Sequence, residues 1–271
     1  MTSLTRSCPF YEGVATGVAC RTVRYRGSRE FGWDGVYTDL APVGALLPYA
    51  RDVDQLVQGQ FDRYGAWLEA MDEAGVECRL FVEAGGDLLR AAWNPVRLNR
   101  QGTVELRGMD SNYPDVTLTA AALVVGAADR VRREGLTVVP DDGVRAFEVD
   151  GETLRVPGFG YLGGELLRAA VTGGPESEEA SAYVDSVLSF AGGEGRLAAL
   201  RSHRAREGRY PTTEASILEG YAPHDAHLPE ETGLRLVLEA CDRLEAQAFR
   251  QGARSRSPPE AFARMPARQA R

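Results

Sequence analysis

The sequence predicts an α+β fold, in which amphipathic helices accompany short strands. From Asp52 to Gly75 apolar residues recur three and four positions apart, which is the spacing of a helix with one apolar face. From Thr103 to Met109 apolar and polar residues alternate, which is typical of a strand with one buried face. The dipeptide Asp150-Gly151 separates two short alternating runs and is a strong signal for a tight β-hairpin.

The first helix is predicted to end at Gly75, because glycine commonly closes a helix in a left-handed conformation. Before Asp39 the chain is rich in glycine, arginine and aromatic residues, which favours loops and short strands. The apolar run from Val76 to Glu83 predicts a strand. The apolar stripe of the first helix consists of Val53, Leu56, Val57, Phe61, Tyr64, Trp67, Leu68 and Met71.

A second helix is predicted from Val116 to Arg133, with Asp115 as its N-cap and Gly135 as its end. Its apolar residues are spread over most of its faces, so we expect it to be buried.

The hairpin strands are expected at Ala146–Val149 and Thr153–Val156. Two or three helices are expected between Gly164 and Arg206, separated by Gly-Gly pairs. A last helix is predicted from Glu230 to Phe249. Its apolar stripe consists of Leu234, Val237, Leu238, Cys241 and Leu244.

Residues 1–250 are predicted to fold, whereas residues 251–271 are rich in Arg, Ser, Pro and Ala and are predicted to form a disordered tail. We expect truncation at Gln251 to leave the midpoint of thermal unfolding almost unchanged, because the tail offers few apolar groups to offset the entropy of ordering it. A drop of many degrees in thermal melts would show that Phe262 or Met265 packs on the body.

Composition and charge narrow the classes of partner. The 271 residues are 44% hydrophobic and 26% charged, as in an ordinary globular protein. A net charge of −8 and a pI of about 5.1 disfavour nucleic acid or an anionic membrane as partner. Met1 to Cys8 has no apolar core, and no stretch is apolar long enough to span a bilayer. We therefore expect a cytoplasmic protein whose partners are small molecules or other protein chains.

The four cysteines, Cys8, Cys20, Cys78 and Cys241, lie far apart and form no C-x-x-C pair. This spacing predicts free thiols in a reducing compartment rather than a zinc site or a redox dithiol. Cys78 lies in an apolar run and Cys241 in a helical stripe, so we expect both to fill the core.

The segment from Gly102 to Asp110 carries the most informative pattern. If it is a strand, Val104 and Leu106 point to one side, while Glu105 and Arg107 point to the other. We expect the two apolar residues to be buried and the two charged residues to face a common cleft. The alternative is an ion pair on a solvent-facing sheet.

This pattern, Val104-Glu105-Leu106-Arg107 followed by Asp110, resembles the late core strand of glutamate-cysteine ligases and related carboxylate-amine ligases. The similarity spans most of the chain to about Phe249. It also includes Pro9-Phe10-Tyr11-Glu12-Gly13 with Thr16-Gly17 and Arg21, Ala92-Trp93-Asn94-Pro95-Val96-Arg97, the small apolar helix from Leu118 to Arg130, and more weakly Ser202-His203-Arg204-Ala205-Arg206-Glu207-Gly208.

The resemblance implies a glutamine synthetase-like fold, with a mostly antiparallel sheet backed by helices. It also implies an enzyme that uses ATP and magnesium to join glutamate, or a similar amino acid, to an amine such as cysteine. In this family the residue matched by Glu105 helps to hold catalytic magnesium, and the one matched by Arg107 contacts the transferred phosphoryl group. The implied substrate-binding residues are Arg21, Arg24, Trp93 and Arg97, although Arg21 is also compatible with an ordinary surface arginine.

The family has an earlier strand with paired glutamates that supply further magnesium ligands, and this sequence has no such strand before Glu105. The resemblance therefore implies a fold that is incomplete at its N-terminal side. We expect the chain alone to bind ATP weakly and turn over slowly, and to self-associate or require a complementary N-terminal polypeptide. The alternative function is a catalytically incomplete binding or assembly subunit of such a ligase.

Three further motifs have structural explanations. The segment Gly158 to Gly163 has the G-x-G-x-x-G spacing of dinucleotide-binding proteins, but a Gly-, Pro- and Glu-rich loop follows where a second parallel strand is required. A glycine-rich turn is the preferred interpretation. His224 and His227 lie between prolines, which predicts an exposed turn rather than a metal site. His203 is expected at a solvated helix end.

Overall fold

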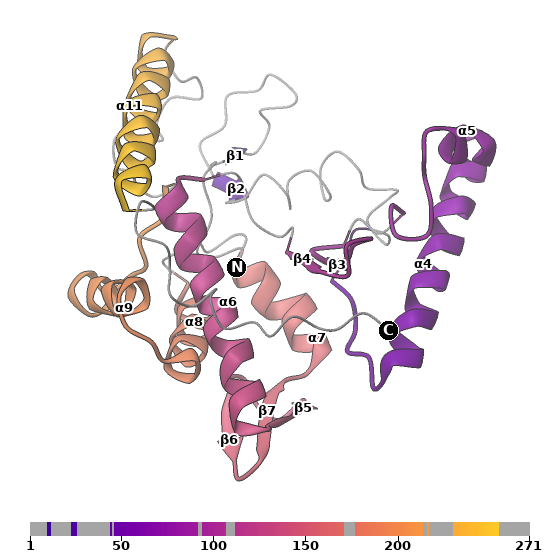
Figure 1. The fold of residues 1–271 in the computed structure, drawn as a ribbon, viewed down its shortest axis with the longest axis horizontal. Helices are drawn as coiled ribbons and strands as arrows, with labels where there is room; N and C mark the ends of the chain where they lie inside the picture. Colours follow the sequence, from indigo (N-terminus) through magenta and orange to yellow (C-terminus); the bar gives the residue numbers. More distant parts are fainter. Residues whose placement is uncertain are drawn as a thin grey trace, which may run out of the picture.

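The chain folds as a mixed α+β protein in a computed structural model (Figure 1). The structure describes residues 10–11, 23–25, 44, 46–91, 94–106, 112–170, 177–213, 216 and 230–254. The predicted α+β class is confirmed. Among the described helices, none is both long enough and apolar enough to cross a membrane.

Helix α4, Val53–Glu73, confirms the first predicted helix. The side chain of Asp52 caps its N-terminus by accepting a hydrogen bond of 2.8 Å from the backbone N–H of Gln55. After the C-cap Ala74, Gly75 adopts a φ of 68°, which fits glycine's predicted role. Its apolar stripe is only partly covered, since the exposed fractions of Val53 and Phe61 are 72% and 54%.

The predicted strand from Val76 to Glu83 is wrong, because this segment contains helix α5, Cys78–Glu83. A short apolar run fits a strand and a buried helix equally well, and side-chain packing decides between them. Here the ring of Phe81 lies 5.8 Å from that of Trp67 and 6.5 Å from that of Tyr64, centroid to centroid. These aromatic contacts attach α5 to α4.

The main core lies between α6, Pro114–Glu134, α8, Glu178–Ala191, and α9, Arg196–Glu207. Two or three helices were predicted between Gly164 and Arg206, and α8 and α9 are two of them. Their shared hydrophobic cluster consists of Leu123, Val184, Leu188, Leu197, Leu200 and Tyr210. A second cluster joins this layer to the strands below it in Figure 1 and consists of Leu136, Leu154, Val156 and Phe190.

Helix α6 corrects two predictions, one about its N-cap and one about its burial. Tyr113 is the N-cap and Pro114 occupies the first turn, where its missing N–H is not needed, so Asp115 is not the cap. The helix is also less buried than expected, since Val125 is 65% exposed although Leu123 is only 4% exposed. Only the faces of α6 that meet its neighbours are covered. Its predicted end at Gly135 is confirmed.

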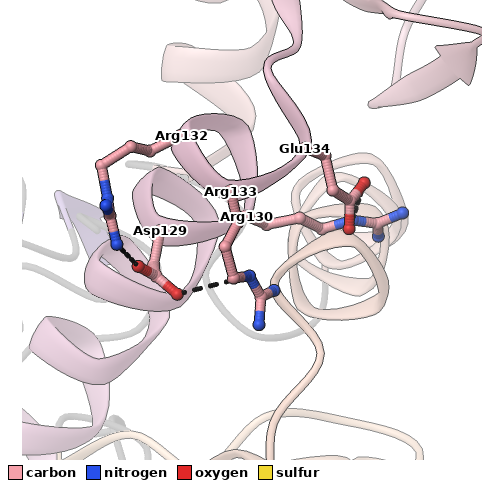
Figure 2. A network of polar contacts seen from close by, with 5 residues as sticks. All are labelled: Asp129, Arg130, Arg132, Arg133 and Glu134. Atoms are coloured by element: carbon pink, nitrogen blue, oxygen red, sulfur yellow. Dashed lines mark hydrogen bonds and ion pairs between the residues drawn. The ribbon is translucent and has the colours of Figure 1, made fainter.

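Charged residues surround the last turn of α6 (Figure 2). Arg132 and Arg133 approach Asp129 at 2.7 and 3.6 Å, and Arg130 lies 3.0 Å from Glu134. Exposed pairs of this kind contribute little to stability. The guanidinium of Arg130 also donates a 2.9 Å hydrogen bond to the carbonyl of Phe190 and lies over its ring, so it links α6 to α8.

The strands form three small sheets in the described part of the chain. Strands β6, Glu148–Asp150, and β7, Thr153–Pro157, confirm the Asp-Gly hairpin. Strand β5, Thr137–Asp141, was not predicted and pairs with β7 in parallel. The other pairs are antiparallel: β1, Phe10–Tyr11, with β2, Val23–Tyr25, and β3, Val96–Leu98, with β4, Val104–Leu106. Strands β1 and β2 agree with the short strands expected before Asp39.

Helix α11, Glu230–Arg254, confirms the last predicted helix and extends past Gln251, where the tail was predicted to begin. Residues 255–271 lie outside the described part. Its apolar stripe is exposed, with Leu234, Val237 and Leu238 each more than half accessible. Cys241 on this helix and Cys78 in α5 are both exposed, so the expectation that they fill the core is wrong.

Replacing Gly135 by alanine is expected to destabilise the fold by roughly 1 kcal/mol, because its φ of 64° is costly for a residue with a Cβ atom. Thermal or urea unfolding measures this change. Gly160→Ala is the matched control, since Gly160 lies in a helix without positive φ and a Cβ atom there meets nothing within 4 Å. Equal stability of the two variants would contradict the prediction.

Candidate functional site

The predicted Glu105 strand is one half of the β3–β4 hairpin. Asn99 shapes the connecting loop, because its side chain accepts hydrogen bonds from the backbone N–H groups of Gln101 and Thr103 at 3.0 and 3.1 Å. Gly102 supplies the left-handed residue, with a φ of 72°. The hairpin is therefore specified locally by an Asn-x-x-Gly turn.

Arg97 and Glu105 face each other across this hairpin. They are direct partners in the antiparallel register, and the Nε–H of Arg97 donates a 2.7 Å hydrogen bond to Oε2 of Glu105. Their side chains are 23% and 37% exposed, so water reaches the pair only in part. Two residues of the predicted site are thus joined on the polar face of one small sheet.

The opposite face of the hairpin is aliphatic. It consists of Val96, Leu98, Val104 and Leu106. The alternation predicted for the strand is confirmed over Val104–Leu106, but the expected burial of Val104 is wrong, because its exposed fraction is 61%. A two-stranded sheet buries an apolar face only if another element packs on it, and no described element covers Val104.

The other predicted site residues are not placed by the structure. Arg107, Arg21 and Trp93 lie outside the described residues. Arg24 belongs to β2, but its side chain lies outside the described part. The expected cleft shared by Glu105 and Arg107 therefore stays a prediction, and Arg97 is the charged neighbour that the structure gives to Glu105.

Glu105 is the predicted magnesium ligand, and its carboxylate is engaged by Arg97. Among the described residues, no group of three or more His, Cys, Asp or Glu side chains could hold a metal ion. The described surroundings of Glu105 therefore do not make a preformed metal site.

The glycine-rich segment from Gly158 to Gly163 follows β7 and opens α7, Phe159–Tyr161, and the π-helical turn η4, Leu162–Leu166. A Cβ atom at Gly158 would meet the side chain of Asp142, which is exposed, and would lie 3.3 Å from its Cα atom. Burial, followed by a hydrogen bond to Glu179, raises the pKa of Tyr161 to about 12. After η4 the next described element is α8, so the described chain lacks the second parallel strand of a dinucleotide-binding unit.

The predicted histidine turn lies outside the described residues. His203 lies within α9, Arg196–Glu207, and is half-buried, so its expected position at a solvated helix end is only partly matched.

A cavity of about 200 Å³ was not predicted from the sequence. It lies where the N-terminal part of α6 meets α9, α11 and residues 211–213 and 216. The residues that line it are Asp115, Val116, Thr119, Ala120, Leu200, Pro211, Thr212, Thr213, Ser216 and Arg243. They come from α6, α9, the residues that follow α9, and α11, so no single local motif marks them.

No protein-family model, no curated protein and no solved structure matches the chain.

Proposed function

We propose that this chain carries part of the active site of an ATP-dependent carboxylate-amine ligase. The reaction joins the carboxylate of glutamate, or of a similar amino acid, to an amine such as cysteine through an acyl phosphate. The observation that carries the proposal is the Arg97–Glu105 pair, in which two residues selected from the sequence hydrogen-bond across one hairpin.

The chemistry requires positive charge beside two anions. A carboxylate oxygen of the acid attacks the γ-phosphorus of ATP while the bond to the ADP oxygen breaks. The amine then attacks the acyl carbon, phosphate leaves with the electrons of the C–O bond, and the nitrogen releases a proton. Because both reactants of the first step are negatively charged, oriented cationic groups lower its barrier.

Arg97 suits the binding of such an anion, because a guanidinium presents several N–H donors in a planar fork. Glu105 engages one edge of this fork through Nε and so fixes the direction in which the guanidinium points. Since the pair is half-buried, its field is screened less than that of a fully exposed pair. Arg107, Arg21, Arg24 and Trp93 complete the proposed substrate site.

When a magnesium ion is bound together with ATP, it neutralises charge on the phosphate oxygens. Within the described residues Glu105 has no companion carboxylates that would form an octahedral site with it. The proposal therefore needs further magnesium ligands from outside the described residues. We accordingly propose that the glutamine synthetase-like sheet is incomplete on the N-terminal side of residues 1–250, and that the protein acts in the cytoplasm, where ATP is available.

A second candidate is a catalytically incomplete binding or assembly subunit of such a ligase. Exposed apolar faces favour it. They occur on the hairpin at Val104, on α4 at Val53 and Phe61, and on α11 at Leu234. Apolar helix and sheet faces that are exposed in this way are found on surfaces that another polypeptide, or a second copy, covers.

The test is ADP release with glutamate and a panel of amines, using the chain alone and together with any polypeptide encoded immediately upstream. We expect the chain alone to release ADP at well below roughly one per second, because a loosely held metal loses its catalytic position. The ligase proposal requires activity that depends on both glutamate and an amine once the partner is added.

The possible outcomes separate the candidates. Dependence on a partner supports the incomplete ligase. Binding of a partner without ADP release under any combination supports the assembly subunit. Release at about one per second or faster by a monomeric chain alone would show that all ligands come from this sequence.

A further inference from the structure

The cavity beside α6 has a cationic end formed by Arg243 of α11. The guanidinium carbon of Arg243 lies 4.0 Å from the centre of the Tyr113 ring, and this stacking limits where the guanidinium can move. Within the described part of the chain no carboxylate pairs with Arg243. A stacked guanidinium without a carboxylate partner is suited to bind the carboxylate of a ligand in a bidentate manner.

The other polar groups of the cavity offer hydrogen-bond acceptors. The hydroxyl of Thr213 donates to Asn112 at 2.8 Å, that of Thr119 to the carbonyl of Asp115 at 2.7 Å, and that of Ser216 to a backbone carbonyl at 3.2 Å. Each of these hydroxyl protons is therefore used within the protein, which leaves the hydroxyl oxygens to act as hydrogen-bond acceptors. A ligand group that donates hydrogen bonds suits this wall.

Because Asp115 carries a negative charge, the hydrogen-bond donor of the ligand is expected to be a cationic group rather than a neutral hydroxyl. Asp115 is one of the residues that line the cavity, and its carboxylate lies 2.8 Å from Arg196; a carboxylate can accept more than one hydrogen bond. Both Arg196 and the N-terminal end of α6 oppose a bound cation. Asp115 is the lining carboxylate that offsets them, so selection for an ammonium group depends on this residue.

The backbone N–H groups at the start of α6 already donate hydrogen bonds within the protein, so they do not bind a ligand. The N–H of Asp115 donates to Oε1 of Gln247, a residue of α11 that is only 4% exposed. The N–H groups of Val116 and Thr117 donate to the carbonyl of Tyr113. The cavity thus binds through its side chains, and the buried Gln247 holds α11 against α6.

The remaining lining is apolar and small. It consists of Val116, Ala120, Leu200 and Pro211. The volume of about 200 Å³ is below that of pockets for drug-sized ligands, which run from roughly 300 to 1,000 Å³. A short aliphatic or thiol side chain therefore fits, whereas a long or charged one does not.

We propose that this cavity binds a small zwitterionic α-amino acid, with its carboxylate on Arg243 and its ammonium group on Asp115 and the neighbouring hydroxyl oxygens. The site is formed by residues other than Arg97 and Glu105, and its occupation does not depend on the ligase proposal.

The experiment is titration calorimetry of the purified chain, without ATP, using a set matched to alanine. L-Alanine and L-cysteine carry both groups, L-lactate replaces the ammonium by a hydroxyl, propionate lacks it, and ethylamine lacks the carboxylate. We expect the two amino acids to bind with a dissociation constant of roughly 1 mM or tighter and the three analogues to bind at least about tenfold more weakly.

Four variants test the assignment of groups. Arg243→Gln is expected to weaken alanine binding by roughly tenfold or more, and Asp115→Asn to remove the preference for alanine over lactate. Val116→Phe keeps every polar group but fills the cavity, so it is expected to abolish binding. Arg235→Gln is the control, because Arg235 lies on the same helix, pairs with Glu239 at 3.9 Å and does not line the cavity.

Thermal melts confirm that each variant is folded before it is titrated. The proposal is overturned if no amino acid gives saturable binding below roughly 10 mM, if lactate or propionate binds as tightly as alanine, or if Val116→Phe binds alanine like the wild type. Because ATP is absent, none of these results depends on whether the chain is a ligase.

Discussion

Replacing Glu105 by glutamine is expected to lower glutamate- and amine-dependent ADP formation by roughly 100-fold or more, in whichever preparation shows that activity. The substitution keeps the size of the side chain but removes the charge that orients Arg97 across the hairpin at 2.7 Å. It also removes the carboxylate that is proposed to help hold magnesium. The measurement is the initial rate of ADP release at saturating ATP.

Asp150→Asn is the matched control for Glu105→Gln. Asp150 also belongs to a hairpin and accepts a hydrogen bond of 3.1 Å from an arginine on the adjacent strand, Arg155. Its side chain is 75% exposed and is assigned no part in the site. If both variants retain the wild-type rate, Glu105 and Arg97 form only a surface ion pair, and the ligase proposal loses the observation that carries it.

Leu188→Ala is expected to destabilise the fold by about 2–5 kcal/mol, which lowers the midpoint of thermal unfolding by roughly 5–15 °C. Leu188 is 1% exposed and lies in the cluster that α6, α8 and α9 share. Removing its branched end leaves a cavity that these helices close only in part. Differential scanning calorimetry measures the midpoint.

Leu234→Ala provides the comparison, because the same atoms are removed from a side chain on α11 that is 59% exposed. Its expected effect is within about 0.5 kcal/mol. A large loss of stability in Leu234→Ala, measured at low protein concentration, would show that the α11 stripe is covered by part of the same chain.

The sequence by itself determined the elements whose signals are local. The helix capped at Asp52, the helix end at Gly135 and the Asp150-Gly151 hairpin were all predicted, because each depends on a cap or a turn formed by neighbouring residues. The strand alternation around Glu105 was predicted for the same reason. Side chains two positions apart must share a face.

Tertiary structure decided which apolar faces are covered and which charged groups meet. Val104 and Cys241 fit a buried pattern, yet both are exposed, since a pattern states which residues share a face and not whether another element packs on it. The segment after Val76 became a helix through its aromatic contacts, and β5 formed by pairing in parallel with β7, a contact that no local pattern signals.

The two candidate sites differ in the same way. Glu105 was found from its strand, but its partner Arg97 is set by the register of a hairpin whose loop spans Asn99 to Thr103. The cavity between Asp115 and Arg243 has no local signature at all, because it forms only where separate helices pack together. Contacts of this long range depend on the packing of the whole core, and no short segment of one sequence contains that information.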